Sequence, residues 1–175
     1  MDFWAKTTDD GKPGISVYQH MVNVGCVAHC IAEAAPELLK RFNLLAPIAG
    51  ALAALHDLGK ISPGFQRKCE QWLVENNLDQ IAKKGCWETG TEPDHGKASH
   101  AAIQDFLVQQ GCARSIAKYV AAALGGHHGR IKFLPNDRGI KPPLIAPISE
   151  DRSGLDWNTE RLQCLGKRSE LHCVL

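Results

Sequence analysis

Apolar residues recur three and four positions apart along most of this chain, which is the spacing of one face of an α-helix. No stretch alternates apolar and polar residues for long enough to predict a strand. Prolines and glycines divide the pattern into segments, because both residues interrupt helices. The resulting helical segments are residues 16–31, 36–42, 48–58, 65–73, 98–110 and 113–124, with a weaker one at 157–165. The sequence therefore predicts an all-α fold.

The first long helix has a clear beginning. Ser16 is followed three residues later by Gln19, which is the pattern of a capping box. The helix that follows carries one apolar face, predicted to be buried. Its members are Met21, Val24, Ala28 and Ile31.

The helix over residues 48–58 has a predicted end at Gly59, a common residue just after a helix. His56 and Asp57 would then lie in its last turn. Consecutive residues on a helix point about 100° apart, so these two side chains would address different directions. The segment between Gly85 and Gly96, rich in Gly, Thr and Pro, is predicted to be a loop.

Length and composition limit the classes of protein that remain. The chain has 175 residues, enough for one domain with a little left over, and 44% are hydrophobic, so a core can be buried. Lys and Arg number 20 against 19 acids, which excludes binding to nucleic acid by bulk charge alone. The start shows no export signal, and seven cysteines are then expected to be reduced thiols in the cytoplasm. The longest apolar run, residues 44–55, is short and broken by Pro47 and Gly50, so no membrane association is expected.

The amino-acid composition changes after residue 129. Four prolines and an excess of basic residues predict a long surface loop near the C-terminus. We therefore divide the chain into a core of residues 1–130, a Pro-rich basic loop of residues 131–156 and a C-terminal segment of residues 157–175. The last ten or so residues lose the helical pattern, as though a longer domain had been cut short.

Histidine is the unusual residue of this chain, with eight copies. Five of them lie at predicted helix ends or beside glycines, where a side chain can project into a shared cleft. They are His20, His56, His95, His127 and His128, and Asp57 directly follows His56. Imidazoles with one carboxylate suit Mn, Fe, Co, Ni or Zn better than Mg or Ca. Six ligands are too many for one catalytic ion, but they suit two ions about 3.5–4 Å apart, with Asp57 between them.

The residues also resemble a known family. His56-Asp57-Leu58-Gly59-Lys60 resembles the signature of HD-domain metal-dependent phosphohydrolases. Other segments narrow the resemblance to the HD nuclease domain of the CRISPR-associated nuclease-helicase of type I systems. These segments are Trp4-Ala5-Lys6, Tyr18-Gln19-His20-Met21, Phe65-Gln66, His95-Gly96-Lys97-Ala98-Ser99 and His127-His128-Gly129. The resemblance covers roughly residues 1–130 and implies an HD-domain-like helical bundle.

The resemblance implies a metal-dependent single-stranded DNA nuclease that acts in type I CRISPR interference. It implies two divalent ions, Fe, Mn, Co or Ni rather than Mg or Zn. One ion would be held by His20, His56 and Asp57, and a second by His95, His127 and His128, with Asp57 as the bridge. Lys60 would lie beside the scissile phosphate, and Ser99 would line the same cleft. The implied partners are single-stranded DNA, a helicase on another chain (no phosphate-loop motif is found in this one) and a crRNA-guided surveillance complex.

Some assignments have rivals. His100 competes with His95 as a ligand, and the His-x-x-x-Ser spacing of the family favours His95. Lys97, Arg130 and Lys132 flank the ligand positions and could follow a DNA backbone, or they could belong to a solvated basic loop.

The chain departs from the family at one point. The family completes its first ion site with a further Asp downstream of the His pair, within a segment resembling Ala-Asp-x-x-Ala-Ser. The downstream aspartates here, Asp137, Asp151 and Asp156, lack that context. The first site is therefore expected to be weak or open. Two alternatives follow: a shortened domain with a binding or regulatory role, or a generic HD nucleotide phosphohydrolase.

Overall fold

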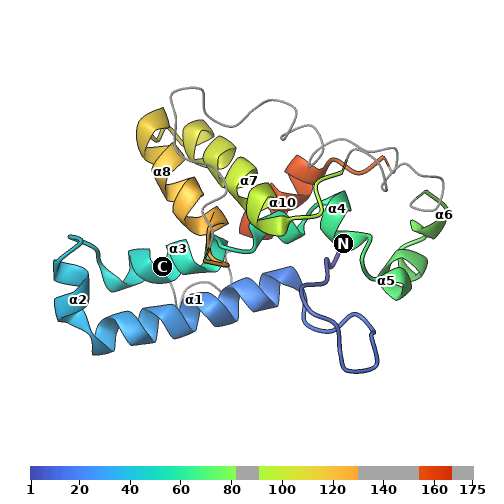
Figure 1. Cartoon of the computed structure of the whole chain (residues 1–175), viewed down its shortest axis with the longest axis horizontal. Coiled ribbons are helices and arrows are strands. Elements are labelled where there is room, and N and C mark those ends of the chain that lie inside the picture. The colour runs from blue at the N-terminus through green and yellow to red at the C-terminus, as the bar shows by residue number, and fades with distance from the viewer. Residues whose placement is uncertain (82–90, 130–153, 167–175) are drawn as a thin grey trace.

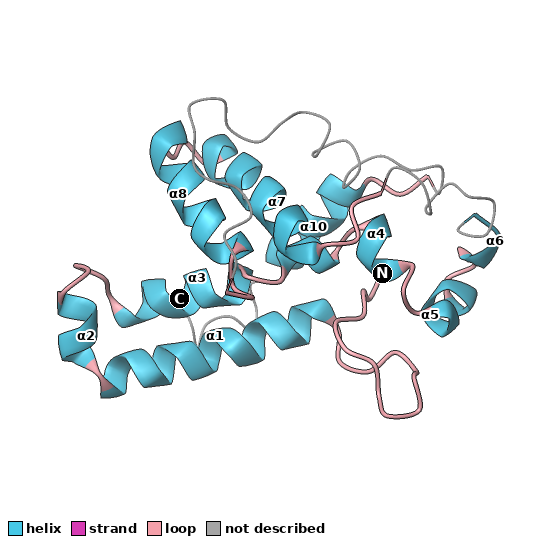
Figure 2. Ribbon diagram, in the orientation of Figure 1, coloured by secondary structure: helices cyan, strands magenta, loops and turns pink. Residues whose placement is uncertain are grey.

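The computed structural model describes residues 1–81, 91–129 and 154–166 (Figure 1). Within these ranges the chain forms helices and turns, with isolated bridges near the N-terminus but no strand (Figure 2). The elements are α1 (Val17–Ala34), α2 (Pro36–Lys40), α3 (Ala46–Leu55), the 3-10 helix η1 (Leu58–Lys60), α4 (Pro63–Gln66), α5 (Glu70–Glu75), α6 (Asp79–Ile81), α7 (His95–Gln109), α8 (Arg114–Gly125) and α10 (Trp157–Gly166). The predicted all-α class is confirmed.

Helices α1 and α3 lie side by side as one pair, with α2 joining them at one end (Figure 1). The Ser16 hydroxyl accepts the Gln19 amide hydrogen at 3.2 Å, so the predicted start of α1 is correct. The Gln19 side chain donates to Asn23 instead of reaching back, so only half of the capping box forms. The predicted apolar face is wrong at its far end. Ile31 is 61% exposed, while the smaller residues Gly25 and Ala32 are buried, because small side chains let α1 approach α3 closely.

Helix α3 ends at Leu55, three residues before the predicted end. The chain then tightens into i→i+3 hydrogen bonds, from the amide of Lys60 to the carbonyl of Asp57 and from that of Ile61 to Leu58. Gly59 does not end an α-helix but lies inside η1, pressed against α7. A Cβ on Gly59 would lie 2.1 Å from the backbone nitrogen of Ser99, a distance that no side chain can occupy.

Helices α7 and α8 form the second pair, on the other side of η1 (Figure 1). Helix α7 begins at His95 and not at Ala98 as predicted, because the Asp94 carboxylate accepts hydrogen bonds from the amides of Gly96 and Lys97. A Cβ on Gly96 would lie 2.6 Å from the Gly125 carbonyl oxygen, so the two helices touch through glycine backbone. The first turn of α7 is therefore fixed from two sides.

The core joins the N-terminal segment to the C-terminal helix. Phe3 packs against both Trp72 and Trp157, with ring centroids 5.8 and 5.5 Å apart. Trp157 is fully buried and Cys164 is buried as well, so α10 shares the core of the preceding helices. Helix α10 was the weakest helix of the sequence prediction, yet it contributes the largest fully buried side chain.

Several sequence predictions fall outside the described residues. Among them are most of the Pro-rich loop, Arg130 and Lys132, and the aspartates Asp137 and Asp151. In the parts that the structure describes, no helix combines the length and the apolar character needed to cross a bilayer. The five cysteines described are all free thiols.

Candidate metal centre

The carboxylate of Asp57 lies at the point where the two helix pairs meet. Asp57 is 3% exposed and lies between α3 and η1. Its Oδ2 lies 2.9 Å from Nε2 of His20 on α1 and 3.1 Å from Nε2 of His56 at the end of α3. The third neighbour of Oδ2 is Nζ of Lys60, at 2.7 Å. One oxygen of Asp57 therefore faces the α1–α3 pair.

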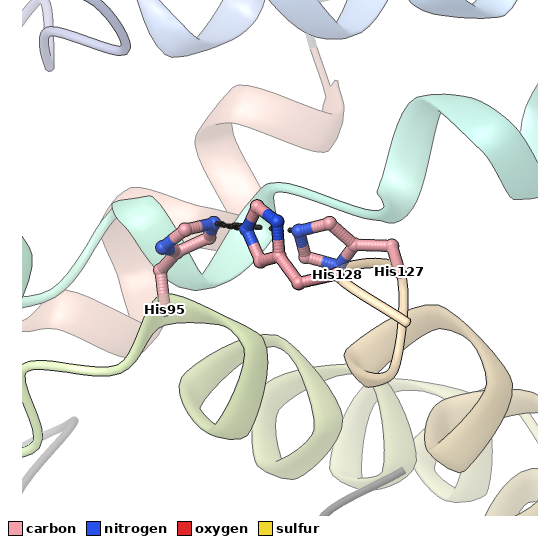
Figure 3. Close-up of side chains that lie close together, drawn as sticks. All are labelled: His95, His127 and His128. Atoms are coloured by element: carbon pink, nitrogen blue, oxygen red, sulfur yellow. Dashed lines mark hydrogen bonds between the residues drawn. The ribbon is translucent and has the colours of Figure 1, made fainter. Parts of the chain in front are cut away.

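The other oxygen of Asp57 faces the α7–α8 pair. Nε2 of His95 and Nε2 of His127 lie 3.3 and 3.4 Å from Oδ1, yet this buried oxygen makes no hydrogen bond of good geometry. Nε2 of His128 lies 2.9 Å from Nε2 of His95, and that of His127 lies 3.3 Å from it. Figure 3 shows the three rings converging from the start of α7 and from the turn after α8.

These residues form two groups of ligand atoms, and within each group the atoms lie within 4.8 Å of one another. We call His20, His56 and Asp57 the inner cluster, and His95, His127 and His128 the outer cluster. All six residues singled out in the sequence as candidate ligands are brought together, from α1, the turn after α3, the first turn of α7 and the turn after α8. His100, the rival of His95, belongs to neither group and is 4% exposed.

Two of the imidazoles are held in a defined tautomer by backbone carbonyls. Nδ1 of His56 lies 2.8 Å from the Ala53 carbonyl, and Nδ1 of His127 lies 2.7 Å from that of Leu124. A carbonyl can only accept, so each Nδ1 carries the hydrogen and donates it. In the neutral ring, Nε2 then presents its lone pair to the cluster, as a metal-ligating histidine requires.

The charges around Asp57 favour its ionised form. Burial opposes ionisation, but the imidazoles of His127, His56 and His95 and the ammonium of Lys60 outweigh it and hold the pKa of Asp57 far below its usual range. The same contact with Asp57 raises the pKa of His127. Burial lowers the pKa of His20 and, together with the neighbouring imidazoles, that of His128.

Each cluster offers a set of atoms that could hold a metal ion. Oδ1 of Asp57 is a buried, ionised oxygen without a good hydrogen bond, and such an atom is costly to leave unsatisfied. The Nε2 atoms of His95 and His128 face each other at 2.9 Å, where at most one of them can carry the shared hydrogen. A cation held by the outer cluster would satisfy both conditions, and nitrogen-rich ligands with one carboxylate suit transition metals.

Lys60 lies beside the inner cluster and is only 6% exposed. Its ammonium group donates to the Ala5 carbonyl at 3.2 Å and pairs with Oδ2 of Asp57. The ring of Phe65 lies below it, with 5.4 Å between Nζ and the ring centroid. The ammonium that the resemblance places beside a phosphate is therefore adjacent to the candidate ligands.

Ser99 lies elsewhere than the resemblance implied. It is fully buried, and its hydroxyl accepts the amide hydrogen of Gly59 at 2.9 Å. The structure thus places Ser99 behind η1, as support for its backbone, and its hydroxyl is not among the atoms around Asp57.

Three further buried polar side chains, to which the sequence alone assigned no role, hold the same turn. Ser62 donates to the Gly59 carbonyl at 2.8 Å, Gln66 donates to the Lys60 carbonyl at 2.8 Å, and Arg161 on α10 donates to the Ile61 carbonyl at 2.7 Å. All three are 4% exposed or less. Gln66 could have been suspected from the Phe65-Gln66 pair in the family pattern, but no local signal marks Arg161, one hundred residues away from its partner.

The candidate DNA-binding residues are only partly described. Lys97, on the first turn of α7, is half-exposed and lies 3.4 Å from a carboxylate oxygen of Glu92. Arg130 and Lys132 lie outside the described residues. Asp156, the one downstream aspartate that the structure describes, accepts hydrogen bonds from the amides of Asn158 and Thr159 at the start of α10.

An all-α fold in which helix ends gather imidazoles around one His-Asp pair is an HD-domain fold. The family model described as "Cas3, HD domain" matches residues 4–172, and the chain belongs to this family. The chain is also similar to the CRISPR-associated endonuclease/helicase Cas3 of Thermus thermophilus, with 30% identity over 137 residues. That alignment covers 72% of this chain but 14% of the relative, so the chain spans only a small part of the relative's length. No solved structure matches the chain.

Proposed function

We propose that this chain is a metal-dependent nuclease domain that hydrolyses single-stranded DNA in the cytoplasm during type I CRISPR interference. The observation that carries the proposal is the shared Asp57 carboxylate, which faces one cluster with each oxygen. This is the arrangement expected of two cations a few ångströms apart that bind one phosphodiester. Membership of the Cas3 HD family and similarity to the Thermus endonuclease/helicase support the same reaction class.

In this proposal the inner cluster would hold one divalent ion and the outer cluster would hold a second, with Asp57 offering one oxygen to each. Fe, Mn, Co or Ni suits a set of five imidazoles and one carboxylate. When bound, such ions polarise a phosphate oxygen and lower the pKa of a water molecule that attacks phosphorus.

The chain's own residues would orient the ligand rings and offset the negative charge of the substrate. The Ala53 and Leu124 carbonyls fix the rings of His56 and His127, so that Nε2 faces the cluster. The ammonium of Lys60 lies next to Asp57, where it can offset the negative charge that develops on the phosphate. Lys97, with Arg130 and Lys132 farther along the chain, would contact the DNA backbone. No covalent nucleophile is needed.

The proposed partners follow from the same relationship. Single-stranded DNA is the substrate, a helicase subunit or domain supplies it, and a crRNA-guided surveillance complex directs both to the target. The Thermus relative is named an endonuclease/helicase, which supports this pairing. A second candidate function, a binding or regulatory domain of low activity, is favoured by one observation: among the described residues, Asp156 serves as a helix cap and adds no ligand to the inner cluster.

The proposal is tested by incubating the metal-free chain with circular single-stranded DNA and Mn, Co or Ni. We expect metal-dependent cutting that falls at least about 100-fold in His56→Ala and Asp57→Ala. His29→Ala is the control, since it also removes a histidine, but one that lies on α1 and pairs with Glu33 outside the clusters.

Undiminished cutting by both variants would contradict the proposal. Phosphate release from nucleotides without action on DNA would instead favour a generic phosphohydrolase. DNA binding without cutting, with fewer than two ions per chain, would favour the regulatory alternative.

A further inference from the structure

Gln66 is a fully buried polar residue at the end of α4, and neither cluster uses it. Its side-chain amide donates two hydrogen bonds, to the Lys60 carbonyl at 2.8 Å and to the Trp4 carbonyl at 2.9 Å. Its side-chain oxygen accepts the Trp4 amide hydrogen at 3.3 Å. The Trp4 indole also donates to the Gln66 carbonyl at 3.2 Å. Gln66 thus ties the N-terminal segment to η1.

The N-terminal segment in turn holds the far end of the Lys60 side chain. Nζ of Lys60 donates to the carbonyl of Ala5, the residue that follows Trp4. Gln66 therefore binds the backbone of Lys60 and also the segment that accepts from its ammonium group. Both ends of one flexible side chain are set by a single buried amide.

A lysine side chain needs such contacts to keep its ammonium group in one position. The ammonium is a point charge on a stem with four carbons, and many rotamers are open to it when nothing holds it. Electrostatic assistance to phosphate hydrolysis depends on donors that already point at the place where charge develops. A displacement of about 1 Å can cost about 100-fold in rate.

We infer that Gln66 is a positioning residue that places the Lys60 ammonium beside Asp57 for contact with the substrate phosphate. This inference rests on the proposed nuclease function. Gln66 acts through Lys60 and does not itself contact metal or DNA.

The test is a double-mutant cycle on the metal-loaded protein, with Gln66→Met and Lys60→Ala. Methionine keeps the length of the side chain but removes its three hydrogen bonds to Trp4 and Lys60, while the backbone bonds of residue 66 remain. We expect Gln66→Met to lower kcat for single-stranded DNA about 100-fold, with little change in KM. In the Lys60→Ala background the same substitution should change kcat by less than about threefold, because the ammonium it acts on is gone. The content of bound metal should stay that of the wild type.

Leu73→Ala is the control for simple destabilisation, since Leu73 is a buried residue of α5. It should lower the melting temperature and leave kcat per folded molecule within about threefold of the wild type. If Gln66→Met does not fold, Gln66→Asn serves in the same cycle, because it keeps the amide but shortens its reach. An effect of equal size in the Lys60→Ala background, or a loss of bound metal, would overturn the inference.

A second readout does not depend on cleavage. Reductive methylation of Lys60, followed by mass spectrometry, reports how firmly its ammonium is held. We expect the rate to rise at least about tenfold in Gln66→Met and to stay near the wild-type value in Leu73→Ala. If the wild type cuts no DNA, the proposed function fails while this measurement still decides the positioning role. Equal methylation rates in Gln66→Met and the wild type would refute that role.

Discussion

The inner and outer clusters use similar residues but have different surroundings. The inner cluster belongs to the α1–α3 pair, contains the only carboxylate, and has side chains 4–18% exposed. The outer cluster belongs to the α7–α8 pair, consists of three imidazoles, and includes the exposed His128. Lys60, whose ammonium group pairs with Asp57, also lies beside the inner cluster.

Charge and solvent access are therefore distributed unequally between the two clusters. The inner cluster is backed by a turn whose carbonyls and amides are held by buried side chains, so its geometry is set before any ligand binds. The outer cluster depends on a short turn after α8, and its rings face Oδ1 of Asp57, a buried oxygen without a good hydrogen bond. Because the Lys60 ammonium already offsets the charge of Oδ2 and the sequence predicts a weak first site, we expect the inner ion to be held less tightly than the outer ion.

The largest loss of stability is expected from a substitution that forces the two clusters apart. In Gly59→Ala the new Cβ would lie 2.1 Å from the Ser99 nitrogen and 2.3 Å from the His95 carbonyl oxygen, so η1 and α7 must move apart. We expect the free energy of unfolding to fall by about 4 kcal/mol, measured by urea denaturation.

Gly166→Ala is the matched control, because nothing lies within 4 Å of a Cβ at that position. If Gly59→Ala were as stable as Gly166→Ala, the close contact between Gly59 and α7 would be contradicted.

The second prediction is a pH dependence of stability that arises from His100, a buried residue of the α7–α8 pair. Burial lowers the pKa of His100 to about 4, against an ordinary value near 6.5. As the pH falls below about 6.5, the unfolded chain takes up a proton at this residue and the folded chain does not. The free energy of unfolding should therefore decrease by about 3 kcal/mol between pH 6.5 and 4, and His100 should add no further loss below pH 4.

The contribution of His100 is isolated by comparing the wild type with His100→Gln in urea denaturation across this pH range. All other ionisable groups are common to the two proteins, so their contributions cancel in the difference. A difference that does not vary with pH would contradict the assignment of a buried neutral imidazole to this half.

The smallest expected effects are losses of metal affinity, and they compare the inner cluster with the outer cluster directly. His56→Gln should lower the affinity of the inner ion about 100-fold, and His128→Gln should lower that of the outer ion about tenfold. Calorimetric titration of the metal-free variants with Mn measures both. Equal losses would show that the two clusters are not as different as their surroundings indicate.

The sequence was sufficient for features that depend on local pattern. The helical segments followed from apolar spacing, and the candidate ligands followed from histidines at helix ends and beside glycines. The end of α3 was missed because it depends on Gly59 fitting against Ser99, forty residues away in the chain. The roles of Ser99 and Arg161 were missed for the same reason, since a hydrogen bond to a distant carbonyl leaves no trace in spacing.

The burial of Phe3, Trp4 and Ala5 has a practical consequence for protein engineering. An affinity tag or a fused reporter can be joined ahead of Met1, which is 47% exposed, provided that a linker leaves the next residues free to dock. A shortened version starting at Lys6 would lack the carbonyl that anchors the ammonium of Lys60. Trimming a few seemingly dispensable residues would therefore remove part of the candidate reaction centre.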